Sequence, residues 1–432
     1  MRSKQLRVLF AAVAALALVA SACADDDDAD DTTTEAPDNG EATGGDRGNV
    51  DGVLVLGSMV PQTGDLSVIV ESLQVPIDIA IEEINEAGGV LGEEVVLIQG
   101  DDGTDPSVAQ TTYDQLVNSE NVDAIIGPAP SSVAARVTES IGTDQVPMCS
   151  GSTTAADLTD AGDGYFFRTA PGDSLQGPAL AELIANDRQT SVAIVARNDD
   201  YGSGFADELG TALDESGIDV TETVLYNPDS GTGYDADVQQ AIDSDPEAVV
   251  VIGFNDDGAQ ILSAMIGAGA GPADIPIYTA DGMQSDELGA TVDPDDPSVV
   301  AGIRGTAPAA APEGIEHPFQ GIFAETELPT IFSPYYYDCT ILMALAVEAA
   351  GTDEGSAVQA AFAGNLEGDN DCSSFAECKQ LLEDGETIHY RGASSTFDSW
   401  LTMEPGTGIY DTWQYDEDGE QEDLGNQISI TL

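Results

Sequence analysis

The chain has 432 residues and carries 80 acidic residues against 11 Lys and Arg, a formal net charge of −69 at pH 7. Such an acidic surface repels nucleic acid and anionic lipid headgroups, and we expect neither as a partner. Because like charges oppose the compact state and salt screens them, we expect a salt-rich habitat and a fold that low ionic strength weakens. The two His and five Cys residues show no zinc-site spacing, so we predict no metal and no cofactor.

Residues 1–22 are predicted to form an export signal. A basic start precedes the apolar stretch from Val8 to Ala20, which is too short for a stable membrane anchor. The segment Ser21-Ala22-Cys23 resembles a bacterial lipoprotein cleavage site, although Ala20 stands where Leu is usual. We therefore expect Cys23 to be acylated, so that a lipid alone holds the exported protein at the outer face of the cell membrane or in the periplasm. A plain secretory signal cut near Cys23 is the alternative.

Residues 23–50 are acidic, rich in Thr and Gly, and free of any apolar period. Such a segment cannot bury enough apolar surface to fold, and we predict a disordered tether. No later segment is long and apolar enough to cross a bilayer. The remaining ~385 residues exceed one ordinary hydrophobic core, so two lobes are expected.

Strand and helix patterns alternate from Val53 onward. The first series consists of short apolar strands separated by helices, over residues 53–56, 73–87, 95–98, 106–119, 124–126, the helix from Ser131, and 146–149. This alternation predicts a parallel sheet built from βαβ units. Residues 165–168 look like a strand that leads out of this lobe.

A second series follows Pro171. It contains helices over 175–187 and 205–213, and strands over 192–195, 220–226, 249–252 and 275–278. Residues 302–308 resemble a return crossing, residues 335–350 a strongly apolar helix, and residues 392–432 carry short strand patterns. We predict an α/β fold of two doubly wound parallel-sheet lobes joined by a multi-crossing hinge. The N-terminal lobe comprises 51–170 plus 307–391, and the C-terminal lobe 171–306 plus 392–432.

Two hydroxyl-rich loops follow neighbouring strands of the first series. Gly127–Ser132 follows the strand at 124–126, and Cys149–Thr154 follows the strand that starts at Val146. In open α/β sheets, ligands lie outside the carboxyl ends of the strands. Hydroxyl groups, free backbone N–H groups and the helix that begins at Ser131 can together receive a carboxylate. Two ordinary N-cap turns are the alternative, but the two loops together favour a ligand cradle.

The cysteines suggest one disulfide. Cys372 and Cys378 flank a short loop in a chain with an export signal, so we expect them to be bonded. Cys149 and Cys339 could form a second bridge or remain two buried thiols, and the sequence leaves this open.

Eight short motifs are weak singly but specific in their order and spacing: Pro61-Gln62-Thr63-Gly64, Ile84–Gly92, Asp101–Pro106, Ile126-Gly127-Pro128, Leu158-Thr159, Phe167-Arg168-Thr169, Gln176-Gly177 and Tyr201-Gly202-Ser203-Gly204. With them, the chain from Val53 to Trp413 resembles the periplasmic substrate-binding lipoproteins of branched-chain amino-acid ABC transporters, the leucine/isoleucine/valine-binding-protein-like family. The resemblance implies the type I periplasmic binding protein fold, in which two lobes close on a small ligand.

The resemblance also implies roles for residues of the first lobe. Ser131, which follows the Gly-Pro turn, matches a serine that binds the ligand α-carboxylate. Thr154 matches a threonine that holds the carboxylate and the ammonium group. Ser152 matches a residue whose main-chain carbonyl accepts from the ammonium group.

In the second lobe, Tyr201 matches a tyrosine at the cleft, and Phe254 stands where a tyrosine contacts the ligand. Asp281 stands where the family has a glutamate for the ammonium group. Because Asp281 is one methylene shorter, either the ammonium group or the lobe must shift, or a water must bridge the two. Near Val68-Ile69 the family often has an aromatic residue, where this chain is aliphatic.

These features predict a monomeric binding protein that delivers an amino acid, branched-chain or otherwise hydrophobic, to an ABC permease. A hydrolase is disfavoured, because the chain has no Gly-x-Ser-x-Gly motif and neither His lies in a motif that would pair it with a nucleophile. We therefore expect no enzyme activity. Two alternatives remain open: a short amide, urea or small organic acid as the ligand, and a sensory or adhesion module that uses the same cleft.

Overall fold

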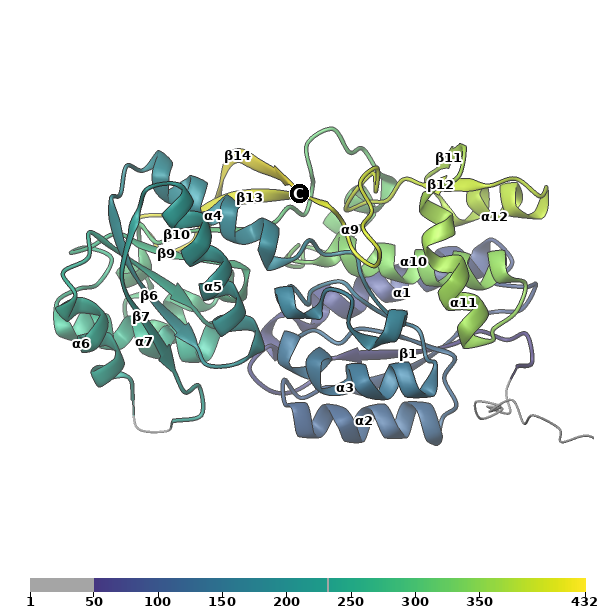
Figure 1. Ribbon diagram of the computed structural model, residues 1–432, viewed down its shortest axis with the longest axis horizontal. Coiled ribbons are helices and arrows are strands. Elements are labelled where there is room, and N and C mark those ends of the chain that lie inside the picture. The colour runs from purple at the N-terminus through teal and green to yellow at the C-terminus, as the bar shows by residue number, and fades with distance from the viewer. Residues whose placement is uncertain (1–49, 231–232) are drawn as a thin grey trace, which may run out of the picture. The chain divides into compact units, whose positions relative to one another are not determined.

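The computed structural model describes residues 50–230 and 233–432 (Figure 1). The predicted export signal, Cys23 and nearly all of the acidic segment lie outside these residues. Among the residues described, no helix has both the length and the apolar character that a membrane span requires.

The first sheet has five parallel strands in the order β2-β1-β3-β4-β5, as predicted for a βαβ series. The strands are β1 (Val55–Val60), β2 (Val96–Asp101), β3 (Ala124–Ile126), β4 (Met148–Ser150) and β5 (Phe166–Arg168). On one face lie α2 (Pro106–Asn118) and α3 (Ser131–Asp144), and on the other α1 (Val70–Glu86) and α10 (Ser333–Ala350) (Figure 1). Because βαβ crossovers cover both faces, the central strands are buried and apolar.

The second sheet has seven strands in the order β14-β13-β10-β9-β8-β6-β7. Five are parallel: β6 (Ser191–Arg197), β7 (Asp219–Tyr226), β8 (Ala248–Ile252), β9 (Ile277–Thr279) and β10 (Arg304–Pro308). One face packs against α4 (Asp173–Asn186) and α5 (Asp200–Glu215), and the other against α6 (Asp235–Asp243) and α7 (Asn255–Ala268).

The C-terminal part differs from the sequence prediction in one respect. The short strand patterns form one long hairpin, β13 (Thr407–Tyr415) and β14 (Gln421–Thr431), which pairs antiparallel with β10. The predicted return crossing at 302–308 is therefore itself a sheet strand. A tight turn can join only antiparallel neighbours, and the acidic segment 416–420 makes that turn.

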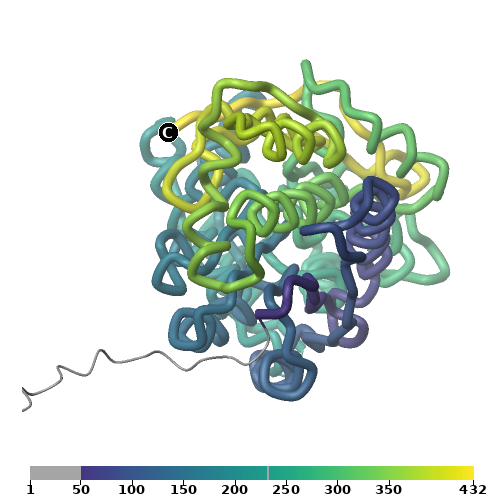
Figure 2. Tube along the Cα trace, turned by 90° about the vertical axis from the view of Figure 1, so that its right-hand side faces the viewer, coloured from purple at the N-terminus to yellow at the C-terminus, as the bar shows by residue number. Residues whose placement is uncertain are grey.

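The chain passes between the two sheets three times within the described residues, after β5, after β10 and after the strand β12 (Ile388–Tyr390). Between the second and third passages lie α11 (Gly355–Phe362), β11 (Asn370–Cys372) and α12 (Phe375–Glu383). Figure 2 shows this late segment beside α1, which comes early in the sequence, and α12 contacts both α1 and α10. The first-sheet layer is thus completed by residues from two distant parts of the chain.

Both pairs of cysteines form disulfides. Cys372 and Cys378, the pair expected from the sequence, join β11 to α12. Cys149 and Cys339, for which the sequence left two possibilities, are also bonded and join β4 to α10. Cys149 and Cys339 are both fully buried.

Five basic side chains of the described residues are already engaged with acceptors of the chain itself. Arg168, Arg197, Arg304 and Arg391 form ion pairs with carboxylates, and the Lys379 ammonium group donates to the Gly89 carbonyl oxygen at 2.7 Å. These cations therefore have little capacity left to offset the acidic surface.

We accordingly expect thermal stability to depend strongly on salt. The melting temperature in dilute buffer should lie at least about 5 °C below that in molar salt, roughly 4 kcal/mol of unfolding free energy for a chain of this size. Calorimetry over a series of KCl concentrations checks this, with sucrose as an uncharged control for general stabilisation. Equal melting temperatures in dilute buffer and molar KCl would contradict it.

Candidate functional site

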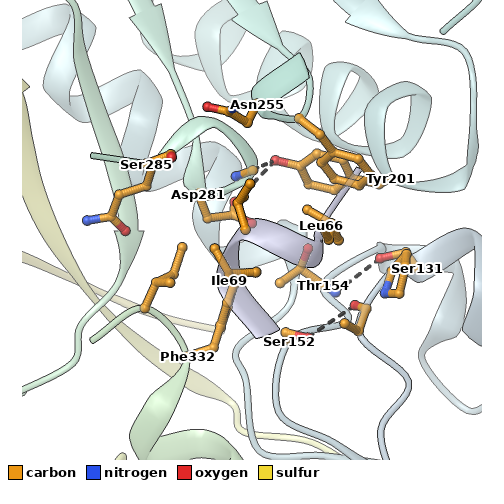
Figure 3. A pocket seen from close by; sticks show the side chains of 17 residues that line it. Leu66, Ile69, Ser131, Ser152, Thr154, Tyr201, Asn255, Asp281, Ser285 and Phe332 are labelled. Carbon is orange, nitrogen blue, oxygen red and sulfur yellow. Dashed lines mark hydrogen bonds between the residues drawn. The ribbon is translucent and has the colours of Figure 1, made fainter. Parts of the chain in front are cut away.

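A pocket lies at the carboxyl ends of the strands, between loops that follow β3 and β4 of the first sheet and β8 and β9 of the second. Its empty space, opening included, is about 520 Å³. The structure brings all six predicted ligand residues together in its lining, as Figure 3 shows for most of them: Ser131, Ser152, Thr154, Tyr201, Phe254 and Asp281. The lining positions follow from the strand order, because both sheets present their strand ends to the same space.

The first-lobe residues Ser131, Ser152 and Thr154, which we call the polar cradle, are joined by hydrogen bonds. The Ser131 hydroxyl oxygen accepts from the backbone N–H group of Thr154 at 3.3 Å (Figure 3) and from that of Ala155 at 3.2 Å. Since its oxygen accepts both bonds, the hydroxyl proton stays free to be donated elsewhere. Ser131 is also the first residue of α3, where a helix favours negative charge.

The Ser152 side chain is turned toward the protein. Its hydroxyl donates to the Ala129 carbonyl oxygen at 3.1 Å (Figure 3) and lies 2.9 Å from the Tyr336 hydroxyl. Any contact of Ser152 with a ligand therefore falls to its main chain, which is the role that the family resemblance implies.

The loop before α3 is held by buried groups below it. Gly127 has a φ of +117°, and a Cβ atom there would lie 2.2 Å from the Met59 carbonyl oxygen, so only glycine fits. The Asp102 carboxylate accepts from the Ala129 N–H group at 3.2 Å, and burial raises the pKa of Asp102 to about 7. The cradle thus rests on a rigid support.

Asp281 is the acidic group of the pocket. It follows β9 and is only 5% exposed. Its Oδ1 accepts from the Gln176 side-chain amide at 2.8 Å, and from the Tyr201 hydroxyl at 3.3 Å, the bond drawn in Figure 3. Burial raises the pKa of Asp281 to about 6, and the hydrogen bond from Gln176 offsets part of that effect. A buried carboxylate of this kind is stabilised by a cation that enters beside it.

Aromatic rings form the wall next to Asp281. The Tyr201 ring stacks on Phe254 with centroids 5.5 Å apart and planes 14° apart. The Arg197 guanidinium lies 3.7 Å from the Phe254 ring centroid and is held by Asp199 and Asp257. The Tyr201 hydroxyl also accepts from the Gly282 N–H group at 3.3 Å. This wall is therefore fixed before any ligand arrives.

The remaining lining is mostly apolar. The family resemblance had pointed to the region of Val68 and Ile69, whereas Leu66, Ile331 and Phe332 were missed. Leu66, Val68 and Ile69 come from the segment before α1, and Ile331 and Phe332 precede α10. We call Ile331 and Phe332 the apolar end wall. The Ser-Pro pair that follows them signals a helix start, but nothing in the sequence signals that the two residues before it face a ligand.

A second buried acid stands behind the pocket and was also missed. Asp173, the first residue of α4, is fully buried, and neither carboxylate oxygen accepts a hydrogen bond of good geometry. Burial raises the pKa of Asp173 well above its usual range, and the nearby Asp281 adds to this effect. The Asp173 backbone N–H group donates to the Thr154 carbonyl oxygen at 2.7 Å, so this second acid lies beside the polar cradle and outside the pocket lining.

Comparison with known families gives a match over most of the chain. The model of the family described as periplasmic binding protein matches residues 54–389. The chemotactic signal transduction system substrate-binding protein BasB of Halobacterium salinarum is 29% identical, over 82% of this chain and 85% of that protein. The Leu/Ile/Val-binding protein BraC3 of Rhizobium johnstonii is 32% identical, over 40% of this chain and 46% of that protein, less than half of the relative's length.

Solved structures show the same fold. A leucine binding protein, LivK, of Thermotoga maritima superposes with a TM-score of 0.72 at 21% identity, over 88% of this chain and 99% of that one. The substrate-binding protein LivJ of Streptococcus pneumoniae, solved with isoleucine, gives 0.68 at 20% identity, over 88% and 100%. An R. palustris solute-binding protein, solved with 4-hydroxybenzoate, gives 0.67 at 16% identity, over 88% and 97%. The predicted type I periplasmic binding protein fold is therefore confirmed.

Proposed function

Because the chain belongs to the periplasmic binding protein family, we propose that it captures an amino acid with a branched or otherwise hydrophobic side chain between two closing lobes and delivers it to an ABC permease. The observation that carries this proposal is the opposition of donors and acid in one pocket: the polar cradle on the first lobe and Asp281 on the second. A zwitterion has matching charges, and each loses water on entry and needs a fixed partner.

The polar cradle is suited to a carboxylate. Ser131 has a hydroxyl proton to donate, and it opens α3, whose first-turn N–H groups favour an anion. The carboxylate would thus meet neutral donors on a preformed loop, with little reorganisation on binding.

Asp281 is suited to an ammonium group. Its Oδ1 already accepts from Gln176 and Tyr201, which fixes the carboxylate plane and leaves the second oxygen for the ligand. The ligand then bridges the lobe of 51–170 plus 307–391 and the lobe of 171–306 plus 392–432. Because these contacts are complete only when the lobes are closed, binding shifts the population toward closure.

The apolar lining supports a hydrophobic ligand side chain. Leu66, Val68, Ile69, Ile331 and Phe332 supply aliphatic and aromatic contact and no charge. Burying one methylene group here contributes about 0.8 kcal/mol, so leucine, isoleucine and valine should bind better than alanine. Relatives named as Leu/Ile/Val-binding proteins agree with this choice.

Two rival functions have specific support. One structural neighbour was solved with 4-hydroxybenzoate, a carboxylate without an ammonium group, and the cradle alone would serve such a ligand. The relative from Halobacterium salinarum is named for chemotactic signal transduction, so the liganded form could report to a sensory partner rather than to a permease. Cys23 as a lipid anchor is compatible with both.

A thermal-shift screen in molar salt tests the proposal. A ligand that binds only the native state raises the melting temperature by mass action. We expect leucine, isoleucine and valine to give the largest shifts, with alanine smaller and benzoate, short amides and urea near zero. Shifts from benzoate or an amide without any shift from an amino acid would refute amino-acid capture.

Affinity should fall as the pH drops through about 6. The ammonium group needs the ionised form of Asp281, and burial raises the pKa of Asp281 in the empty site to about 6. Below that pH the proton must leave before the ligand binds, so each further unit weakens binding about ten-fold, whereas between pH 7 and 8 affinity stays nearly constant.

Calorimetric titration with leucine at pH 5, 6, 7 and 8 in molar salt measures this. The variant Asp281→Asn has no proton to lose and should show a flatter profile. Equal wild-type affinity at pH 5 and pH 7 would contradict a role for Asp281 in holding the ammonium group.

A further inference from the structure

We propose that the Cys149–Cys339 disulfide is a positioning element of the pocket: it fixes the apolar end wall relative to the polar cradle and thereby sets the size of ligand side chain that the site accepts. This inference rests on the proposed function, because it concerns selection among ligands of the same pocket. Neither cysteine lines the pocket, so the bond would act through the residues that do.

The apolar end wall depends on α10 for its position. Phe332 immediately precedes the helix and has a φ of +57°, which is strained for a large aromatic residue. Its carbonyl oxygen accepts from the N–H groups of Tyr335, at 3.1 Å, and Tyr336, at 3.2 Å. A backbone in this region persists only where its surroundings hold it, and here the first turn of α10 does so. Any shift of α10 therefore moves Phe332.

The first turn of α10 is in turn tied to the cradle. The Tyr336 hydroxyl lies 2.9 Å from the Ser152 hydroxyl, and the Thr169 hydroxyl donates to the Tyr335 carbonyl oxygen at 2.8 Å. A Cβ atom on Gly151 would lie 2.6 Å from the Tyr336 ring and 2.7 Å from its backbone nitrogen. The loop and the helix thus touch without room for a methyl group.

The disulfide is the covalent part of this junction. Cys149 lies on β4, the strand that leads into Ser152 and Thr154, and Cys339 lies on the face of α10 that covers the sheet. The bond joins residues 190 positions apart, and Cys339 Sγ lies 3.4 Å from the Thr169 hydroxyl. Hydrogen bonds and packing tolerate small shifts, whereas the covalent bond holds the Cα atoms of Cys149 and Cys339 at 5.6 Å. Cores transmit such small shifts because they are close-packed.

The second disulfide provides a matched control. Cys372 and Cys378 are also buried but lie six positions apart, on β11 and α12, and neither lines the pocket. Replacing this second pair by alanine also removes a disulfide, but one whose cysteines do not lie beside the polar cradle.

The experiment compares ligand preference rather than affinity alone. The double variants Cys149→Ala/Cys339→Ala and Cys372→Ala/Cys378→Ala are titrated calorimetrically with leucine, valine and alanine in molar salt. If the wild type binds aromatic acids instead, benzoate and 4-hydroxybenzoate replace the amino acids and the proposed function alone fails. Because a methylene group in a shaped pocket is worth about ten-fold or more in discrimination, we expect the leucine-to-alanine preference to fall about ten-fold in the first variant and to stay unchanged in the second.

A merely structural disulfide would lower the melting temperature and leave the preference ratio intact, and that result would overturn the proposal. If the first variant does not fold, Cys149→Val/Cys339→Ala serves instead, since it also removes the bond but refills part of the volume that the sulfur atoms leave. The same loss of leucine-to-alanine preference is then expected, and an unchanged ratio in this folded variant would equally overturn the proposal.

Discussion

Replacing Asp281 by Ala is expected to weaken amino-acid binding by about 2–5 kcal/mol, roughly 30- to several thousand-fold. The carboxylate is buried, its Oδ1 is fixed by Gln176 and Tyr201, and no other residue that lines the pocket is acidic. Without it, the ligand ammonium group would be desolvated and left without its charged partner. Calorimetric titration with leucine at pH 7.5 in molar salt measures the loss.

Asp286→Ala is the matched control, because Asp286 is exposed and lies a few residues further along the same segment. Asp281→Asn separates the charge from the hydrogen bonds and should lose nearly as much affinity as the alanine variant. Unchanged affinity in Asp281→Ala would remove this residue from the site. A melting temperature within a few degrees of wild type shows that the loss is one of binding.

Replacing Glu404 by Ala is expected to destabilise the fold by about 3–5 kcal/mol. Arg168 and Glu404 form an ion pair in which the side chains are 1% and 7% exposed, and Arg168 Nε donates to Glu404 Oε2 at 2.5 Å. Removing the carboxylate leaves a buried guanidinium group without its countercharge, which costs far more than the pair contributes. Equilibrium unfolding in urea with molar salt measures the change.

We expect Glu404→Ala to disturb the position of Ser131 in the ligand site as well, because Arg168 is linked to Ser131 through Ala155. Arg168 donates to the Ala155 carbonyl oxygen at 2.8 Å, and the Ala155 N–H group donates to Ser131.

Glu417→Ala, at an exposed position of the β13–β14 turn, is the control for the stability measurement, and its unfolding free energy should stay within about 0.5 kcal/mol of wild type. Replacing both partners, as Arg168→Met with Glu404→Leu, should recover most of the stability lost. A Glu404→Ala variant as stable as the control would show that the pair is not needed.

The parts of the site that the sequence predicted are those with a local signal. The loops that contain Ser131, Ser152 and Thr154 follow apolar strands directly, and the strand-end rule places them at a ligand edge. The same rule holds for Asp281 after β9, although only the family resemblance distinguished it from an ordinary Asp-Gly turn.

The parts that were missed depend on tertiary packing. Ile331 and Phe332 reach the pocket because α10 returns to the first sheet, and that helix is buried over nearly its whole surface, so its sequence gives no direction. Asp173 is indistinguishable from a first-turn helix acid until its burial is known. The Cys149–Cys339 bond could not be predicted because sequence spacing does not report distance across a sheet.

The three passages between the sheets also bear on how the chain becomes folded. The first sheet is covered by α10, and β10 of the second pairs with β13, which begins at Thr407. Neither half can therefore be completed from an early stretch of polypeptide. Both sheets of a nascent chain would therefore stay incomplete until the residues of β13 had been synthesised, so the two halves would fold together rather than one after the other.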